Sequence, residues 1–201
     1  MSLDWRDVTF IAATPVESKA LRRALPHARI VETGIALASL RDDLGAIVIS
    51  YGLAGGLRTG LKTGALLIPR TVRTPHGELL TCDSEVVDAL AAGARALGIE
   101  PLFDPLLTSD HIVAGAERAQ WAAQGFAAVD METGCIQAPR VAALRVVLDT
   151  PEREISTDWQ RPLLALLKPS NWPQALWLAR EAPRAANLAA KVAMATQGIG
   201  A

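Results

Sequence analysis

The sequence has few cysteines and histidines and no basic cluster. Cys82 and Cys135 are far apart and form no CxxC pair, so we expect neither a disulfide framework nor a zinc site. The three histidines are isolated from one another: His27, His76 and His111. With a net charge of −1 and scattered lysines and arginines, the chain lacks the positive stripe that follows a phosphate backbone. Nucleic acid is therefore not an expected partner.

Long hydrophobic runs are also missing. No stretch approaches the roughly 20 apolar residues of a membrane span. The N-terminus, MSLDWRDVTF, lacks the basic and apolar regions of a signal peptide. We therefore expect a cytoplasmic protein. The 201 residues, of which 50% are hydrophobic and 20% charged, suffice for one domain with a sizeable core.

Short apolar runs alternate with helix-like segments, which indicates an α/β fold with a largely buried sheet. The end of the chain, 159–197, is expected to be helical, with Pro183 restarting or kinking its last helix. The expected strands are 8–13, 29–32, 46–52, 65–72, 105–109, 127–132 and 141–149, and the expected helices are 15–25, 35–43, 84–97, 115–124 and most of 173–197.

Four carboxylates lie where expected strands end. Asp130 and Glu132 close the run FAAVDME, and residues two apart on an extended chain point to the same face. Glu17 follows the first expected strand, and Asp149 ends the seventh. Ligands of open α/β sheets bind at the carboxyl ends of strands. The four carboxylates therefore predict one chemical crevice.

Each of these carboxylates also has a purely structural explanation, which the sequence leaves open. The pair in FAAVDME could be solvated. Thr14, Pro15 and Glu17 form a capping box with proline at the first helical position. Asp149 could likewise cap a helix that starts at Pro151.

The third expected strand runs into YGLAGGL, residues 51–57, which holds three glycines. Glycine lets the backbone approach a ligand closely. A dinucleotide site would instead have G-x-G-x-x-G after the first strand and an acidic residue about 20 positions later. We therefore expect no nicotinamide or other cofactor.

Five segments, in order along residues 8–152, resemble the purine nucleoside phosphorylase and methylthioadenosine/S-adenosylhomocysteine nucleosidase superfamily. They are AATPVESKAL, YGLAGGLRTGLKTGALLIPRTV, LLTSDHIVAG, AAVDMETGCI and LRVVLDT. The tail, LDTPEREIS through WPQALWLAREAPRAANLAAKVA, is more similar to the hopanoid-associated phosphorylases, which remove adenine from adenosylhopane. The resemblance implies a three-layer α/β/α fold with a twisted mixed sheet, cleavage of the N-ribosidic bond of an adenine nucleoside, and a homo-oligomer.

The resemblance also implies a catalytic set. Asp149 would deliver a proton to purine N7, Glu17 would activate water, and Arg145 would help to position that water. A phosphorylase needs an anion site as well, for which Thr33 and Gly34 are the candidates. Because YGLAGGL holds no arginine, the sequence favours water over phosphate as the second substrate.

A substrate-binding set follows from the same resemblance. Glu132 would accept hydrogen bonds from the ribose hydroxyls, Met131 would pack on the sugar, and Asp130 would support that carboxylate or bind a hydroxyl itself. The remaining expected contacts are Ala54, Gly55, Gly56 and Ile112.

The chain departs from the family pattern in ways that keep a second hypothesis open. Leu53 and Leu148 stand where relatives have serines, so two hydroxyl donors near the ligand are lost. The segments before AIVISYG and after Glu132 are shortened. These departures favour the alternative of a degenerate nucleoside-binding protein without catalysis.

The segment 159–178, WQRPLLALLKPSNWPQALWL, holds three of the five tryptophans and is flanked by basic residues. Such a mixture suits a bilayer interface. If the hopanoid resemblance holds, the nucleoside carries a polycyclic hydrocarbon, and we expect weak contact with the inner membrane face through this segment. The alternative is that the segment packs against the sheet or a second subunit.

Overall fold

The computed structural model describes residues 5–37, 44–160 and 167–199, where nine strands form one mixed sheet. The main path of the sheet is β2–β1–β3–β8–β7–β5–β6, and β9 pairs with both β3 and β4. Parallel pairing joins β2, β1, β3 and β9, whereas β8 runs antiparallel to β3. The strands are β1 (Val8–Ala12), β2 (Arg29–Glu32), β3 (Ile47–Gly56), β4 (Leu66–Leu67), β5 (Thr71–Arg73), β6 (Leu79–Thr81), β7 (Leu106–Thr108), β8 (Ala128–Asp130) and β9 (Arg140–Asp149).

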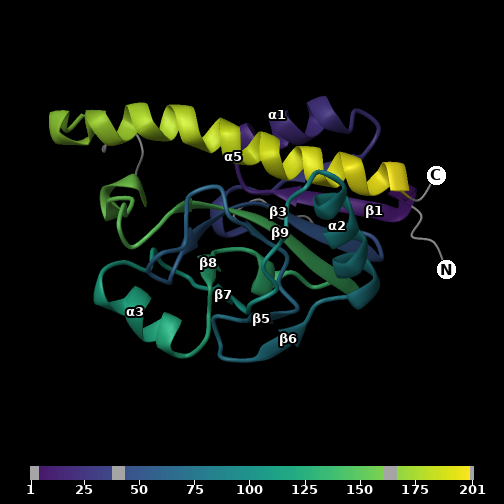
Figure 1. Cartoon of the computed structure of the whole chain (residues 1–201), viewed down its shortest axis with the longest axis horizontal. Coiled ribbons are helices and arrows are strands. Elements are labelled where there is room, and N and C mark those ends of the chain that lie inside the picture. The colour runs from purple at the N-terminus through teal and green to yellow at the C-terminus, as the bar shows by residue number, and fades with distance from the viewer. Residues whose placement is uncertain (1–4, 38–43, 161–166, 200–201) are drawn as a thin grey trace.

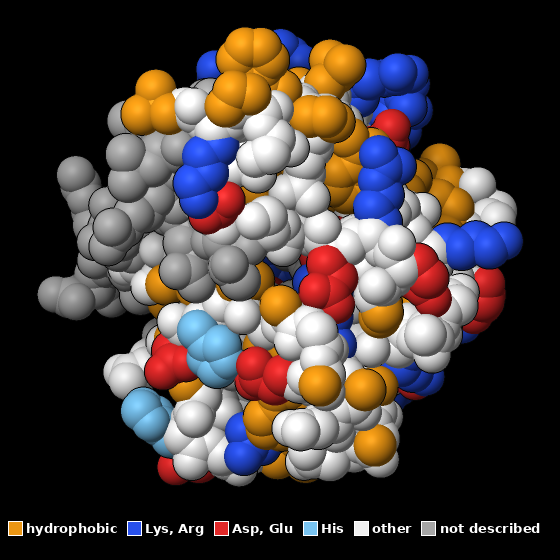
Figure 2. All heavy atoms as spheres, turned by 90° about the vertical axis from the view of Figure 1, so that its left-hand side faces the viewer, with side chains coloured by type: hydrophobic (Ala, Val, Ile, Leu, Met, Phe, Trp, Pro, Cys, Tyr) orange, Lys and Arg blue, Asp and Glu red, His pale blue; other side chains and the backbone are white. Residues whose placement is uncertain are grey.

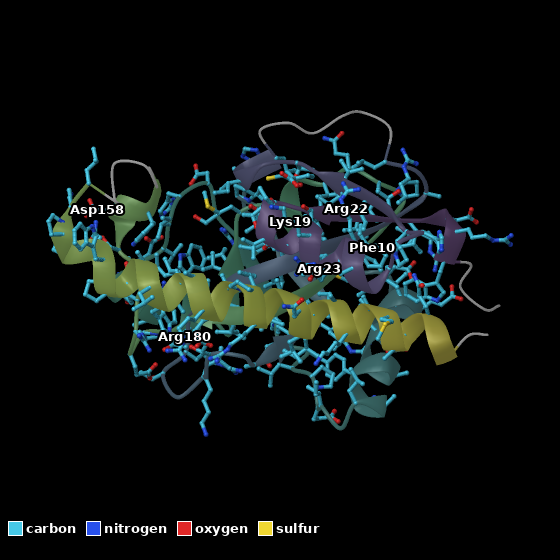
Figure 3. The ribbon with its side chains drawn as sticks, turned by 90° about the horizontal axis from the view of Figure 1, so that it is seen from above. Phe10, Lys19, Arg22, Arg23, Asp158 and Arg180 are labelled. Atoms are coloured by element: carbon cyan, nitrogen blue, oxygen red, sulfur yellow. The ribbon has the colours of Figure 1, made fainter. Side chains whose placement is uncertain are left out.

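Helices flank this sheet on both sides (Figure 1). Helices α1, α2 and α5 lie over one face, and α3 lies on the other side, near β7 and β8. Seen from above, α5 runs along the molecule between α1 and α2 (Figure 3). The helices are α1 (Pro15–Ala24), α2 (Ser84–Ala96), α3 (Ala116–Ala123) and α5 (Trp172–Ile199), and the short 3-10 turns are Trp5–Asp7, Ile35–Leu37, Thr133–Cys135, Thr157–Gln160 and Pro169–Asn171.

The core lies between the sheet and the layer of α1, α2 and α5. Phe10, Ile49 and Leu144 on the central strands are fully buried, as the continuous apolar runs of β1, β3 and β9 require. Helix α5 approaches α2 closely at Gly93, where a Cβ would lie 2.1 Å from the Thr196 hydroxyl oxygen. The alanine-rich second half of α5 is therefore a core element.

The strands and turns differ from the sequence analysis in three places. The expected strand 65–72 is divided into β4 and β5, because Pro69 between them has no N–H for a sheet ladder. The hairpin strand β6 was not expected. No helix starts at Pro151, since Thr150 and Arg153 instead form an isolated bridge that closes a turn.

Three further differences concern the glycine run, the last helix and residues 35–43. Strand β3 extends to Gly56, so YGLAGGL lies mostly inside a strand. Helix α5 continues through Pro183 as one element. Of the expected helix 35–43, residues 35–37 form a 3-10 turn and 38–43 lie outside the described residues.

The pairing of β3 leaves a gap on one of its two sides. Strand β9 accompanies β3 on one side as far as Gly55. On the other side, β1 pairs with β3 only up to Tyr51, and β8 begins at Gly55. Between them, the backbone from Gly52 to Ala54 faces no described strand. This gap lies between the carboxyl ends of β1 and β8.

Candidate active site

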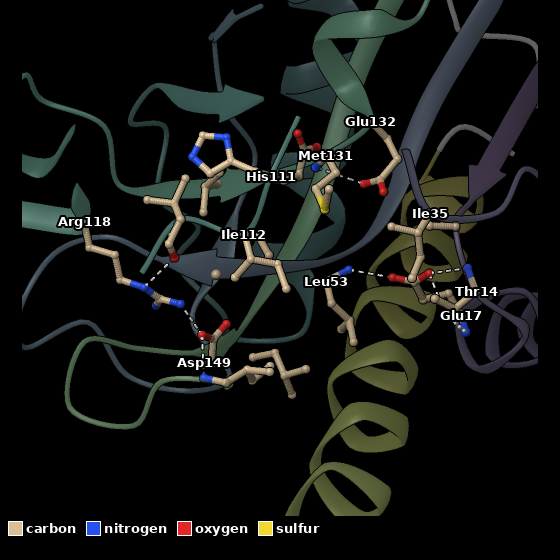
Figure 4. Close-up of a pocket in the computed structure, with 18 residues that line it drawn as sticks. Thr14, Glu17, Ile35, Leu53, His111, Ile112, Arg118, Met131, Glu132 and Asp149 are labelled. Carbon is tan, nitrogen blue, oxygen red and sulfur yellow. Dashed lines mark hydrogen bonds and ion pairs between the residues drawn. The ribbon is translucent and has the colours of Figure 1, made fainter. Parts of the chain in front are cut away.

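A cavity of about 260 Å³ lies at the gap in the sheet (Figure 4). The four carboxylates at the strand ends, Glu17, Asp130, Glu132 and Asp149, all line it, and each is at most 6% exposed. The structure therefore brings the four expected carboxylates together around one cavity. Its other lining residues are Ala13, Thr14, Ile35, Leu53, Ala54, Gly55, His111, Ile112, Val113, Arg118, Val129, Met131, Leu148 and Ile155.

Glu17 closes the capping box at the start of α1 and also reaches β3. Its Oε2 accepts hydrogen bonds from the amide and the hydroxyl of Thr14, both at 2.8 Å. Its Oε1 accepts the Leu53 amide at 2.9 Å, in the stretch of β3 that lacks a neighbouring strand on one side. A carboxylate offers about four lone-pair positions, so Oε1 has room for one more donor, such as a water molecule in the cavity. The capping box and a role in the site therefore do not exclude each other.

Gly52 is the position where the backbone must approach other atoms most closely. A Cβ there would lie 2.3 Å from Glu17 Oε1 and 2.7 Å from Arg145 Nη1. Both distances are far below van der Waals contact, so only glycine fits. The sequence predicted that the glycine run would let the backbone approach a ligand closely. At Gly52 the backbone instead approaches the charged side chains of Glu17 and Arg145.

Arg145 lies behind the cavity wall and is 1% exposed. Its Nη2 contacts Asp130 Oδ2 at 2.7 Å and Glu132 Oε2 at 3.4 Å, and it donates to the Ser50 hydroxyl at 2.6 Å. Burial alone lowers the pKa of Arg145, but the charges of Asp130, Glu132 and Glu17 more than offset this, and the net pKa is raised. Arg145 therefore stays charged and holds the carboxylates in place.

Glu132 faces the cavity and is held by backbone donors. Its Oε1 accepts the Ala36 amide at 3.1 Å, and its Oε2 accepts the Met131 amide at 3.3 Å. Burial raises the pKa of the Glu132 carboxyl, against the opposing charge of Arg145 and with a further rise from Asp130. Glu132 is thus more readily protonated than a solvated glutamate.

Asp130 forms an ion pair with Arg145, which in turn contacts Glu132. Its side chain is completely buried, and its oxygens accept the hydroxyls of Thr108, at 2.7 Å, and Thr133 in addition to the ion pair with Arg145. Of the two roles that the resemblance allowed Asp130, these contacts favour support of the neighbouring carboxylate.

The charges of this cluster do not balance. Among the residues that the structure describes, three buried carboxylates, Glu17, Asp130 and Glu132, surround the single guanidinium of Arg145. Uncompensated buried charge is costly unless a ligand or a proton meets it. The wall of the cavity therefore suits a ligand that carries or develops positive charge.

Asp149 lies across the cavity, where Arg118 binds it (Figure 4). The two form an ion pair between Arg118 Nη2 and Asp149 Oδ2, with side chains only 2% and 6% exposed. The same Oδ2 accepts the Ile155 amide at 3.2 Å. The role implied by the resemblance needs a proton on Asp149, whereas the contacts described here are two donors to its Oδ2.

Sequence reasoning missed Arg118, although one local signal pointed to it. The residue lies in the first turn of α3, where the helix dipole disfavours a positive charge. An arginine placed there needs a partner of opposite sign. That partner is 31 positions away in the sequence, which no local pattern reveals.

The rim of the cavity is partly apolar. Leu53, Leu148 and Ile112 line it and contribute hydrocarbon to the cavity wall. His111 at the rim contacts Asp110 Oδ1 at 2.7 Å through Nδ1. The hydrogen bond to Asp110, followed by that to Glu117, raises the pKa of His111.

Four of the expected site residues do not line the cavity. Arg145 is behind its wall. The Gly56 carbonyl accepts Arg118 Nη1 at 2.8 Å. Thr33 is fully buried, and its hydroxyl donates to the Ala12 and Gly34 carbonyls. The two residues expected to bind phosphate, Thr33 and Gly34, therefore do not line the cavity.

Two negative findings apply to the described part of the chain. No group of three or more His, Cys, Asp and Glu side chains there is arranged to hold a metal ion. No helix within 5–37, 44–160 or 167–199 is long and apolar enough to cross a bilayer.

No protein-family model and no curated protein sequence matches the chain, but solved structures do. A putative methylthioadenosine nucleosidase from Weissella paramesenteroides is 17% identical, with 96% of this chain and 97% of that chain covered and a TM-score of 0.70. A Helicobacter pylori 5′-methylthioadenosine/S-adenosylhomocysteine nucleosidase variant with 5′-methylthioadenosine in its active site is 12% identical, with coverage of 96% and 99% and a TM-score of 0.72. The futalosine hydrolase of the same organism is 12% identical, with coverage of 97% and 98% and a TM-score of 0.71. The chain therefore has the mixed α/β fold that these nucleosidases and hydrolases share.

Proposed function

We propose that this protein is a nucleosidase that hydrolyses the N-ribosidic bond of an adenine nucleoside. The observation that carries the proposal is the surplus of buried carboxylates at one end of the cavity. Departure of a purine leaves oxocarbenium character on the ribose, and negative charge fixed beside it stabilises the transition state more than the ground state. The fold shared with nucleosidases, one of which was solved with 5′-methylthioadenosine bound, supports the same reading.

The contacts of the carboxylates suggest a role for each of them in substrate binding and catalysis. Glu132 would accept the ribose hydroxyls through charge-assisted hydrogen bonds, which are roughly twice as strong as neutral ones. Glu17 would take a proton from water through the free position on Oε1. Asp149 and Arg118, across the cavity, would hold the purine. Arg145 would act through Glu17, Asp130 and Glu132 as a positioning residue.

Water is favoured over phosphate as the second substrate. Arg118 is the only arginine or lysine among the described residues that line the cavity, and it is paired with Asp149. The Thr33 hydroxyl is directed to backbone carbonyls. An anion in the cavity would therefore lie near carboxylates, and the one arginine among the described lining residues is already paired with Asp149.

The first test is adenine release from adenosine and from 5′-alkylthioadenosines, with and without phosphate. We expect release that phosphate does not accelerate. We expect Glu132→Gln to weaken the binding of ribose-containing ligands by about 10²-fold, because it removes hydrogen bonds to a charged acceptor. Its unfolding midpoint at pH 7 should also fall, because Oε1 accepts the Ala36 amide and Oε2 accepts the Met131 amide and Arg145, and glutamine must turn an N–H toward one of these donors. Release of adenine only in the presence of phosphate would replace hydrolysis by phosphorolysis.

The alternative, a nucleoside-binding protein without catalysis, is favoured by Leu53 and Leu148 in the cavity wall. Adenosine binding measured by calorimetry, together with the absence of adenine release by the same preparation, would support this alternative. Release at any pH between 5 and 9 contradicts it.

We further propose that the nucleoside carries a large apolar 5′ substituent, as in adenosylhopane, and that the first half of α5 touches a lipid surface. Leu167, Trp172 and Leu176 are 76%, 60% and 67% exposed. Figure 2 shows hydrophobic side chains gathered at the top of this face, with Lys and Arg beside them. Gln174 connects the patch to the cavity rim, since it donates to the Glu154 carbonyl at 2.8 Å and accepts the Ser156 amide at 2.9 Å.

Liposome flotation tests the lipid contact. We expect the wild type to float with vesicles that contain anionic lipid, and a Trp172→Ala, Leu176→Ala variant to lose most of that binding. The matched control is Leu79→Ala with Leu97→Ala, two exposed hydrophobic residues elsewhere on the surface. Equal flotation of both double variants, or no flotation of the wild type, rules the contact out.

A further inference from the structure

A second cavity, of about 560 Å³, lies beside the first half of α5, and the inference drawn from it rests on the lipid contact proposed above. Its lining includes Arg153, Leu176, Trp177, Arg180 and Glu181. The last four belong to α5 and are spaced by one, three and one residues, so they lie on one face of the helix. None of the five lines the cavity that holds the four carboxylates. The second cavity is therefore distinct from the candidate active site.

Arg153 is fixed beside this cavity through both its backbone and its side chain. Its amide donates to the Thr150 carbonyl at 2.9 Å, in the turn that follows β9. Its guanidinium lies 4.3 Å from the centroid of the Trp177 ring. Stacking on an indole uses the flat face of the guanidinium and leaves the N–H groups at its edge for hydrogen bonds. Trp177 thus holds Arg153 in place without neutralising its charge.

The second cavity carries a surplus of positive charge. Arg153 and Arg180 are both exposed, and neither forms an ion pair with a carboxylate of the described residues. Glu181 is the only acidic residue among the described lining residues, and it already accepts Arg184 Nη1 at 2.8 Å. Two guanidinium groups are therefore available to an anion that enters the cavity.

The same cavity borders the exposed hydrophobic residues of α5. Leu176 lines the cavity and is 67% exposed, and Trp172, four residues earlier on the helix, is 60% exposed. Lys and Arg side chains lie beside the hydrophobic group on this face (Figure 2). A ligand bound here meets guanidinium groups at one end and hydrocarbon at the other. An amphipathic anion uses both ends, whereas a small soluble anion uses only the first.

We propose that this cavity binds the phosphate group of an anionic phospholipid, with Arg153 and Arg180 as the donors and the acyl chains against Trp172 and Leu176. The planar fork of a guanidinium matches two phosphate oxygens at once. A phosphate monoester has three free oxygens and a carboxylate has two, so two arginines engage the phosphate more fully. Binding here holds the protein at the surface in which an apolar nucleoside dissolves.

Co-sedimentation with two kinds of vesicle tests the inference. One kind contains phosphatidylcholine with phosphatidic acid, the other phosphatidylcholine with oleate, and the two are matched in zeta potential. Attraction that depends on charge alone is the same for both. We expect the wild type to bind the phosphatidic acid vesicles about tenfold more tightly, the ratio that corresponds to one charge-assisted hydrogen bond. Equal binding to both kinds overturns the inference and leaves the lipid contact intact.

Charge-conserving variants separate phosphate recognition from charge. Arg153→Lys combined with Arg180→Lys keeps both positive charges and removes the bidentate geometry, so we expect it to bind the two kinds of vesicle equally. The matched control is Arg22→Lys with Arg23→Lys, in the last turn of α1. Figure 3 shows these two arginines on the opposite side of α5 from Arg180, and the control should keep the tenfold preference. A preference that survives in the first variant places the phosphate elsewhere and overturns the inference.

Glycerol 3-phosphate supplies the same phosphate without acyl chains. We expect millimolar glycerol 3-phosphate to leave the protein on the vesicles, and displacement would show that the cavity takes a soluble phosphoester instead. Adenine release from adenosine, measured on the same preparations, should be equal in the wild type and both double variants. Absence of release with the phosphate preference retained refutes only the nucleosidase. Absence of vesicle binding with release retained refutes only the lipid contact and this inference.

Discussion

Replacing Glu17 by glutamine is expected to lower hydrolysis by about 10²- to 10⁴-fold, the range that a general base contributes. The amide cannot take the proton that water loses. Glutamine also fits the capping site less well than the sequence alone would indicate. Glu17 accepts from three donors, the Thr14 amide, the Thr14 hydroxyl and the Leu53 amide, and glutamine must turn an N–H toward at least one of them. We therefore also expect a loss of about 1–3 kcal/mol in unfolding free energy.

The control for Glu17→Gln is Thr14→Ala. It removes the cap hydroxyl, at a cost of about 1 kcal/mol, and leaves the carboxylate and its contact with Leu53. Turnover is measured at substrate saturation, and stability by denaturant unfolding. If both variants lose the same activity, Glu17 is a capping residue only.

Replacing Arg145 by methionine is expected to lower the unfolding free energy by roughly 3–5 kcal/mol, the usual cost of breaking a buried ion pair. This is a large share of the roughly 5–15 kcal/mol by which domains are stable. Asp130, Glu132 and Glu17 would be left without their buried cation. Since ionised carboxylates cause the loss, the variant should be relatively more stable at low pH, where they are protonated.

Arg140→Met is the matched control, because Arg140 starts the same strand, β9. Its ion pairs with Asp83 and Glu85 involve side chains that are 31%, 19% and 42% exposed. Such pairs contribute about 1 kcal/mol or less. Denaturant unfolding of the two variants at pH 5 and pH 8 measures the difference. Equal losses of unfolding free energy in both variants would show that the buried carboxylates depend on Arg145 no more than the exposed carboxylates depend on Arg140.

The parts of the site that the sequence predicted are those defined by short-range rules. The capping box at Thr14 and Glu17 needs only four consecutive residues. The carboxylates at the ends of β1 and β9 follow from the rule that the carboxyl ends of parallel strands form one edge of a sheet, whereas β8 runs antiparallel to β3 and is not covered by this rule. Asp130 and Glu132 were grouped because residues two apart on an extended chain share a face, although β8 ends at Asp130 and the two carboxylates meet at Arg145 instead.

The parts that the sequence did not predict depend on contacts between distant segments. Arg118 meets Asp149 only after α3 has folded against β8, and Ser50, Thr108 and Thr133 hold the Arg145 cluster from three separate elements. No local pattern shows which of these residues contact one another. The division of 65–72 was readable, since Pro69 stands within the run.

The gap beside β3 gives the site a built-in spectroscopic reporter. The Leu53 amide is held by the Glu17 side chain at 2.9 Å, whereas ordinary strand amides are held by a neighbouring backbone. Its hydrogen exchange with solvent and its NMR shift therefore follow the state of a single carboxylate. Any molecule that enters the cavity and engages Glu17 changes this one signal, so candidate substrates can be ranked in a titration before any product is detected.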